Sequence, residues 1–378
     1  MDFAFTEDQT AIRDLVRGIL EGELTPERLK RIEAEPDWFD RKLWATLAEA
    51  GLLGIAVPAA HGGMGLGMLE LAVLLEEIGR TVAPVPILPT LVLAGLPIAA
   101  FGTDTQRETW LPGLAAGETI MTAALLDAGS DDPAMPATTA RADGDGWLLD
   151  GEKRCVPAVH LASRVLVPAR TPEGAALFLV DPAASGVAQT RFVSTTGEPV
   201  FTLKLAGARV DGDQVLGGDV GTAGAQTSWL YEHALAAICA TQVGVSEKAL
   251  ELTTSYVRER EQFGVPIGSF QAVQHRSADA YIDLASMRWL AWRAAWRLAA
   301  GESAARDVAV AKYWAAEGGS RVANTAQHLH GGIGVDLDYP IHRYFVWSKA
   351  LELGLGAATP QLVRLGRSLS KSGPTKLS

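Results

Sequence analysis

Arg260-Glu261-Gln262-Phe263-Gly264 stands where the longest helical pattern of the chain stops. Apolar residues recur at helical spacing before it, and the segments 270–300 and 306–328 repeat that period after it. Pro266 follows, lacks a backbone N–H and fixes its own φ, so one helix cannot run through this stretch. The C-terminal part is therefore predicted to consist of long helices joined by turns.

A second turn lies at His330-Gly331-Gly332-Ile333-Gly334. Such glycine-rich turns expose backbone N–H groups that can hold a pyrophosphate. The arginine of the first turn suits phosphate or carboxylate, and its phenylalanine offers a flat face to an aromatic ring. Two plainer interpretations stay open, a helix C-cap and a charged helix end with a hydrophobic contact. No strand precedes the glycines, which argues against a Rossmann site.

Away from these turns the pattern changes twice. Residues 1–118 and 218–378 have the period of helices, with Thr6 and Asp40 as predicted N-caps, whereas 119–217 contain short strands. No long helix fits between the strands, which favours an antiparallel β-domain. We expect an α+β fold with an N-terminal helical domain, a middle β-barrel-like domain and a C-terminal four-helix bundle. The predicted strands are 120–126, 138–142, 146–149, 164–169, 176–180 and 201–205.

Composition narrows the classes of function. The 378 residues carry 33 Lys and Arg against 44 Asp and Glu, a net charge of −11, which argues against nucleic-acid binding. Cys155 and Cys239 build neither a disulfide framework nor a metal site, so a cytoplasmic location is expected. His330 and His342 lack partners at metal-ligand spacing, so no metal is predicted. The uncharged run 81–103 holds four prolines and suits a buried helix better than a membrane span.

These runs together resemble the acyl-CoA dehydrogenase family over nearly the whole chain. The stretch 50–65 is similar to an N-terminal helical segment of that family, and 76–80 is similar to the helix end that follows it. The two turns, extended to 260–272 and 330–343, are similar to its most specific signatures.

The resemblance implies a reaction, a cofactor and an assembly. In that family a carboxylate removes the α-proton of an acyl-CoA thioester while a hydride leaves the β-carbon for FAD. In its tetramers one subunit holds the flavin ring, the acyl-CoA and the base. The neighbouring subunit reaches across with the two turns and holds the adenosine and pyrophosphate end of the same FAD.

The base that the family requires is absent at its usual places. Most members carry a glutamate in a Tyr-Glu-Gly-Thr run near the C-terminus, where this chain has Leu355, with Ala357 in place of the threonine. A minority carry the base on the helix before the first turn, where this chain has Ala234. Glu232 lies two residues away and would point elsewhere on a helix. Leu235 replaces the arginine expected to support substrate entry.

The middle domain departs from the family as well. The Glu-Pro-Gly-Ala-Gly-Ser loop corresponds to Leu126–Asp131, which keeps only Gly-Ser. In the Gly-x-Lys-x-Trp-Ile-Thr strand, Cys155 replaces the tryptophan that lies beside the flavin ring. Pro157 replaces a threonine that usually hydrogen-bonds the flavin, and proline brings neither a hydroxyl nor an N–H.

Much of what reaches across to a neighbour's FAD is retained. His328 stands where the family usually has glutamine, and Gln327 is one residue off. No residue is predicted to be catalytic. The predicted cofactor-binding residues are Arg260, Gln262, Phe263, Gln327, His328, Gly331 and Gly332.

We therefore expect a partner subunit without chemistry of its own, which shares FAD with a homologous catalytic subunit in an α2β2 acyl-CoA dehydrogenase. The pattern resembles the paired acyl-CoA dehydrogenases of steroid-degrading actinobacteria, and the implied substrate is a steroid with a CoA-thioester side chain. The electron acceptor stays open, with an electron-transfer flavoprotein-like protein as one candidate. Two alternatives remain, a self-sufficient homotetramer with Glu352 or Glu232 as a displaced base and a non-enzymatic acyl-CoA-binding scaffold.

Overall fold

The first helices begin at side-chain caps, as predicted. In the computed structural model, which describes residues 5–130, 132–221 and 223–372, the Thr6 hydroxyl accepts a hydrogen bond from the Gln9 N–H, and the Gln9 side chain accepts one from the Thr6 N–H. Asp40 accepts from the Leu43 N–H at 3.0 Å. The N-terminal helices are α1 (Glu7–Glu23), α2 (Pro26–Glu33), α3 (Arg41–Glu49), α4 (Met68–Thr81), η3 (Leu88–Gly95), α5 (Leu96–Phe101) and α6 (Asp104–Ala115).

The uncharged run that holds four prolines is helical and buried. It forms the π-helical η3 and then α5, and every side chain from Pro89 to Ala94 is buried. Over the described part of the chain, no helix combines the length and the apolar character that crossing a membrane requires.

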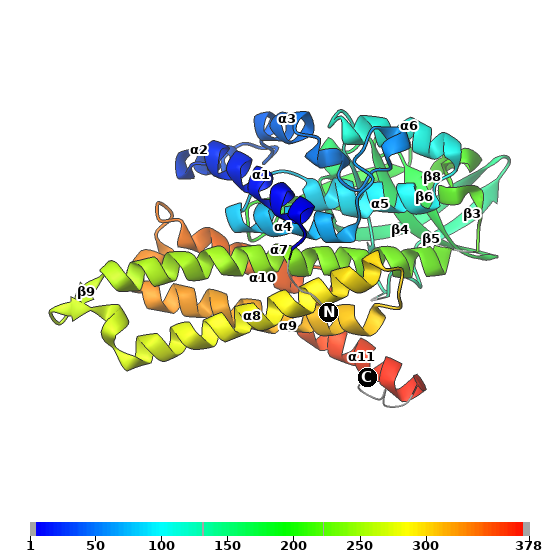
Figure 1. Ribbon diagram of the computed structural model, residues 1–378. Helices are drawn as coiled ribbons and strands as arrows, with labels where there is room; N and C mark the ends of the chain where they lie inside the picture. The colour runs from blue at the N-terminus through cyan, green and yellow to red at the C-terminus, as the bar shows by residue number, and fades with distance from the viewer. Residues whose placement is uncertain (1–4, 131, 222, 373–378) are drawn as a thin grey trace. The chain divides into compact units, whose positions relative to one another are not determined.

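The middle of the chain folds into an 8-stranded sheet (Figure 1). Its long central pair is β4 (Gly146–Pro157) and β8 (Pro199–Asp211), which run antiparallel. Most other pairs are antiparallel as predicted, but β5 pairs in parallel with both β1 and β3, so the sheet is mixed. The remaining strands are β1 (Met121–Ala123), β2 (Leu126–Asp127), β3 (Thr139–Asp143), β5 (Arg164–Thr171), β6 (Gly174–Val180) and β7 (Val187–Val193).

Several strands differ from the sequence prediction: β8 runs on to Asp211 instead of ending at residue 205, and the predicted strand 120–126 is divided into β1 and β2. β4 continues to Pro157 instead of ending at residue 149, because its charged residues from Glu152 onward pair along β8 and Lys153 finds a buried partner. β7 is not predicted at all, because its side chains from Ala188 to Val193 are exposed and show no alternation. Backbone pairing with β8 stabilises it.

A buried ion pair lies inside this domain. The Nζ of Lys153 is 2.6 Å from Oδ2 of Asp127, and the two side chains are 0% and 1% exposed. The other carboxylate oxygen accepts hydrogen bonds from the backbone N–H and the hydroxyl of Thr138. Burial lowers the pKa of Lys153 to about 8, although the charge of Asp127 opposes that shift.

The C-terminal part consists of long helices, as predicted. α8 and α9 pack together, and a short hairpin lies where α7 gives way to α8 (Figure 1). The sequence does not predict α10, because its buried face carries the polar residues Arg343 and Ser348 and the hydrophobic period is weak. The elements are α7 (Ala223–Glu259), β9 (Glu261–Gln262), β10 (Val265–Pro266), α8 (Gln271–Ala299), α9 (Ala305–His330), η8 (Gly331–Val335), α10 (Ile341–Leu353) and α11 (Ala358–Ser372).

The chain divides into two units. One comprises residues 1–29, 72–83 and 235–378, and the other comprises 30–71 and 84–234. In the first unit the end of α4 crosses α7 with backbone contact. A Cβ on Gly244 would lie 1.8 Å from the Glu76 carbonyl oxygen, and one on Gly79 would lie 2.1 Å from that of Thr241. Only glycine permits this approach.

The buried ion pair gives a stability prediction. Asp127→Ala leaves the Lys153 ammonium uncompensated in the core and should lower the free energy of unfolding by about 3 kcal/mol. Asp145→Ala is the matched control, because Asp145 is 90% exposed where it pairs with Arg209. The control should change that free energy by less than about 0.5 kcal/mol. Urea denaturation that moves equally for both variants would contradict the assignment.

Candidate functional site

The hairpin after α7 presents Phe263 to the outside of the chain. β9 and β10 pair antiparallel, and Phe263 at the turn has a left-handed φ of 56°. Its side chain is 93% exposed, and its ring meets that of Phe270 edge-on at 6.2 Å. A positive φ in a non-glycine residue costs about 1–3 kcal/mol and is typical of functional positions. The local fold therefore holds an aromatic face where only a group from elsewhere can cover it.

Arg260 and Gln262 flank this ring. The Arg260 side chain is exposed and its guanidinium forms no hydrogen bond or ion pair with any described residue, although its backbone N–H donates to the Tyr256 carbonyl oxygen at 2.8 Å. Gln262 is also exposed, and its Nε2 donates to the Glu261 carbonyl oxygen at 2.8 Å. The guanidinium retains all its donors for an anion.

The glycine turn leaves open space around its backbone. Gly331 has φ 61° and ψ −138°, which is a glycine conformation. Gly332 has no left-handed φ, and a Cβ on either glycine would meet no atom within 4 Å. Nothing inside the described chain therefore requires glycine at position 332. A group that approaches the backbone closely from outside would require it.

The structure brings the hairpin and the glycine turn together. Tyr256 lies one helical turn before Arg260, and His330 directly precedes Gly331. Their rings stack with centroids 4.6 Å apart and planes at 22°. The two signatures, which are far apart in the sequence, thus lie at the same end of the helices.

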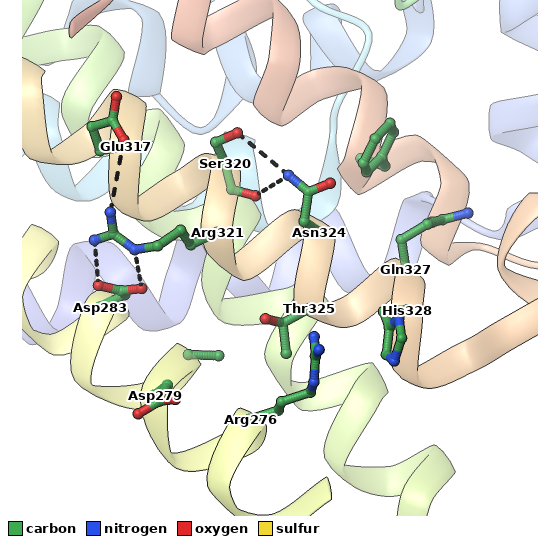
Figure 2. Close-up of a pocket in the computed structure, with 12 residues that line it drawn as sticks. Arg276, Asp279, Asp283, Glu317, Ser320, Arg321, Asn324, Thr325, Gln327 and His328 are labelled. Atoms are coloured by element: carbon green, nitrogen blue, oxygen red, sulfur yellow. Dashed lines mark hydrogen bonds and ion pairs between the residues drawn. The ribbon is translucent and has the colours of Figure 1, made fainter. Parts of the chain in front are cut away.

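A groove of about 820 Å³ between α8 and α9 contains the remaining predicted residues (Figure 2). Gln327 is partly buried and His328 is exposed, and both line it. Figure 2 shows Arg276 extending into the groove on the side of Thr325 and His328. At the far end Asp283 accepts two hydrogen bonds from Arg321, at 2.8 and 2.6 Å.

Arg276 is the residue that sequence reasoning missed. It is exposed and forms no ion pair with the residues described. It belongs to no motif, and its only signal in the sequence is a basic residue in the second turn of the helix that follows the hairpin. Arg276 therefore adds a basic side chain to the end of the helices that carries Arg260 and His328.

The residue at the usual C-terminal position of the base has no proton acceptor in its side chain. Leu355 has φ 53° and lies between Gly354 and Gly356. Glu352, one turn earlier, has its carboxylate paired with the Lys349 ammonium. The buried Lys312 donates to the Leu351 and Glu352 carbonyl oxygens at 3.0 and 2.9 Å, and so caps the end of α10. On α7, Ala234 and Leu235 are fully buried, 0% and 2% exposed.

The strand that the resemblance aligns with the flavin-facing strand of the family is irregular. Cys155 is exposed with φ 51°, at a register shift of β4 between Lys153 and Val156. Pro157 pairs with Val200 without an N–H to donate. The retained Ser130 uses its hydroxyl inside its own loop, where it donates to the Met135 carbonyl oxygen at 2.8 Å. Asp131 of this loop lies outside the described residues.

Comparison with known proteins decides the family. The profile for the N-terminal domain of acyl-CoA dehydrogenases matches residues 6–118, and the profile for the C-terminal domain matches 223–370. The chain belongs to the acyl-CoA dehydrogenase family. Relatives in this family use FAD.

Particular acyl-CoA dehydrogenases are similar along their whole length. Acyl-CoA dehydrogenase FadE27 of Mycobacterium tuberculosis is 41% identical over 98% of this chain and 100% of its own. A variant of the Tcur3481-Tcur3483 steroid ACAD is 45% identical, with a TM-score of 0.91 over 98% of this chain and 99% of its own. The ChsE4-ChsE5 complex from M. tuberculosis contains a chain that is 41% identical, with a TM-score of 0.93 over 99% of this chain and 100% of that one.

Within the part of this acyl-CoA dehydrogenase that the structure describes, no group of three or more His, Cys, Asp or Glu side chains is placed to hold a metal ion. The candidate site therefore consists of an aromatic ring, free guanidinium groups and a glycine turn, which together suit a nucleotide diphosphate.

The two cysteines test the altered strand. Iodoacetamide should modify Cys155 quickly in the isolated chain and Cys239 hardly at all, because burial raises the pKa of Cys239 to about 12. Added FAD should not slow the reaction at Cys155, since this chain is expected to lack the ring site. Peptide mass spectrometry measures both rates, with Cys155→Ser as the control. Protection of Cys155 by FAD would contradict the expectation.

Proposed function

We propose that this chain is the non-catalytic subunit of an α2β2, FAD-dependent acyl-CoA dehydrogenase. It lends its hairpin and glycine turn to FAD that a homologous catalytic subunit holds. The observation that carries the proposal is an asymmetry: the groups suited to a neighbour's nucleotide are exposed and free, whereas the positions that would serve an active site of its own lack the required atoms.

The residues proposed to bind the FAD of the partner subunit lie at one end of the helices. Phe263 offers an uncovered ring face for an adenine, and the Arg260 guanidinium has no partner among the described residues. The Gly331-Gly332 turn leaves room for a diphosphate against the backbone. Arg276 and His328 add basic groups in the adjoining groove. These residues fit the adenosine and pyrophosphate end of FAD, whose flavin, when bound, supplies the hydride acceptor in the complex.

The groups that would form an active site in this chain itself are absent from their usual positions. A base must accept the α-proton of the thioester, and Leu355 has no atom for that task. Pro157 offers the flavin neither a hydroxyl nor an N–H, and the exposed Cys155 offers no broad ring. We infer that the flavin ring, the base and the acyl-CoA belong to the partner's site.

The substrate and the partner are proposed from similarity. The Tcur3481-Tcur3483 protein is a steroid ACAD, and ChsE4 and ChsE5 form a complex. We infer a steroid CoA ester as the substrate, α,β-desaturation as the reaction and a homologous acyl-CoA dehydrogenase chain as the partner. The electron acceptor of such a complex stays open, and an electron-transfer flavoprotein-like protein is one candidate.

The alternatives explain less. A self-sufficient homotetramer needs a displaced base, and the Glu352 carboxylate is paired with Lys349 beside a capped helix end. A non-enzymatic scaffold leaves the exposed Phe263 and the unpaired Arg260 guanidinium without a purpose.

The Arg260 guanidinium provides the first test. In the complex co-produced with the partner, Arg260→Ala should weaken FAD binding by about tenfold or more, because a charge-assisted hydrogen bond is lost. Arg258→Ala is the matched control: Arg258 is exposed on the same helix end and lies about 200° around it from Arg260. The FAD retained per complex is read from flavin absorbance. Equal retention by both variants would refute the role of Arg260.

The carboxylates provide the second test. Glu232→Gln and Glu352→Gln should leave turnover of the complex within about twofold of the unmodified complex, because the partner supplies the base. Reduction of an artificial electron acceptor with a steroid CoA ester measures turnover. A loss of about a hundredfold or more in either variant would favour the self-sufficient enzyme instead.

A further inference from the structure

Three aromatic rings connect the hairpin to the glycine turn. His330 stacks on Tyr256 at 4.6 Å and contacts Tyr339 with centroids 5.3 Å apart. Tyr256 and Tyr339 meet edge-on at 6.3 Å. The rings come from the end of α7, from the end of α9 and from the segment after η8. This three-ring cluster adjoins both segments, because Tyr256 lies one helical turn before Arg260 and His330 directly precedes Gly331.

The two nitrogens of His330 have different surroundings. Nδ1 lies 2.7 Å from the Ala326 carbonyl oxygen, which can only accept, so Nδ1 carries the proton. Nε2 is buried and has no hydrogen-bond partner among the residues described. Burial also lowers the pKa of His330. The lowered pKa and the unpaired Nε2 both favour the neutral ring, and one hydrogen bond fixes its orientation at the last turn of α9.

Packing alone does not account for a histidine here. Phenylalanine would fill the same space without leaving Nε2 buried and unpaired, so the advantage of histidine lies in the Nδ1–H bond. That bond sets the plane of the ring, and the ring plane sets the stack on Tyr256. Arg260 lies one turn beyond Tyr256, and Gly331 follows His330 directly. A change in the stack therefore shifts the guanidinium relative to the glycine turn.

We propose that His330 is a positioning residue, which couples the hairpin and the glycine turn into one rigid surface by stacking on Tyr256 and by contacting the tilted ring of Tyr339. The inference rests on the proposed function, because it assigns His330 to the grip on the shared FAD. A cofactor held at its aromatic and its diphosphate groups requires that the two segments keep a fixed spacing.

The test compares ring loss with ring retention in the co-produced complex. His330→Ala should speed FAD release about tenfold, since an aromatic pair contributes about 0.5–1.5 kcal/mol, which corresponds to roughly two- to tenfold. His330→Phe keeps a ring but loses the Nδ1–H bond, so it should release FAD more slowly than His330→Ala and faster than the unmodified complex. The rate is measured from the rise in flavin fluorescence as FAD leaves the diluted complex. Size-exclusion chromatography verifies that the complex is assembled.

A control separates positioning from general stability. Met287 is buried, 1% exposed, where α8 packs on Gly318 of α9. Met287→Ala should lower the thermal midpoint and leave the FAD release rate unchanged, because it contacts no ring of the cluster. If Met287→Ala speeds release as much as His330→Ala does, the effect is one of stability and the proposal fails.

A double-mutant cycle tests the coupling itself. If Tyr256 and His330 act through one stack, Tyr256→Leu combined with His330→Leu should speed release no more than the stronger single variant does. Multiplied effects would overturn the coupling. Failure of the proposed function looks different, since the isolated chain would then hold FAD of its own or the unmodified complex would hold none. If the unmodified complex holds FAD and His330→Ala leaves its release rate unchanged, the role of His330 is refuted and the proposed function is not.

Discussion

The backbone contact between α4 and α7 is the constraint on which the helical unit depends. Gly79 and Gly244 let the two helices touch where any side chain would collide with a carbonyl oxygen. Polar groups then hold the crossing: Arg80 forms an ion pair with Glu251 at 2.5 Å, and the Tyr344 hydroxyl donates to the Arg80 carbonyl oxygen at 3.0 Å. The crossing prevents α7 from sliding along its axis. It therefore also fixes the position of the hairpin that follows the C-terminal end of α7.

The proposed function depends on the groups at that far end. Stacking of Tyr256 on His330 joins the hairpin to the glycine turn, and the result is an exposed ring, a free guanidinium and an open backbone on one surface. The same helices carry no base at Leu355, and the Lys312 cap shows that the end of α10 is nonetheless well ordered by hydrogen bonds. This contrast between the two ends of the helices is the basis of our proposal that the chain completes the cofactor site of a neighbouring subunit.

Much of this was predictable from the sequence because it depends on local chemistry. The capping box at Thr6, the helix break at Pro266 and the glycine turn are each encoded within a few residues. β7 was not predictable, since its exposed side chains carry no period and its pairing depends on the distant β8. Arg276 was missed for a related reason: only the packing of α8 against α9 places it in the groove beside His328. Features that depend on distant pairing leave little trace in a single sequence.

The most direct test of the account is the amount of FAD per chain, measured by flavin absorbance on this protein alone and co-produced with a homologous catalytic subunit. The account predicts no FAD on the isolated chain and one flavin for each pair of chains in the complex. A full flavin on every isolated chain would contradict it, because the chain would then contain a complete cofactor site and the search for a displaced base would begin.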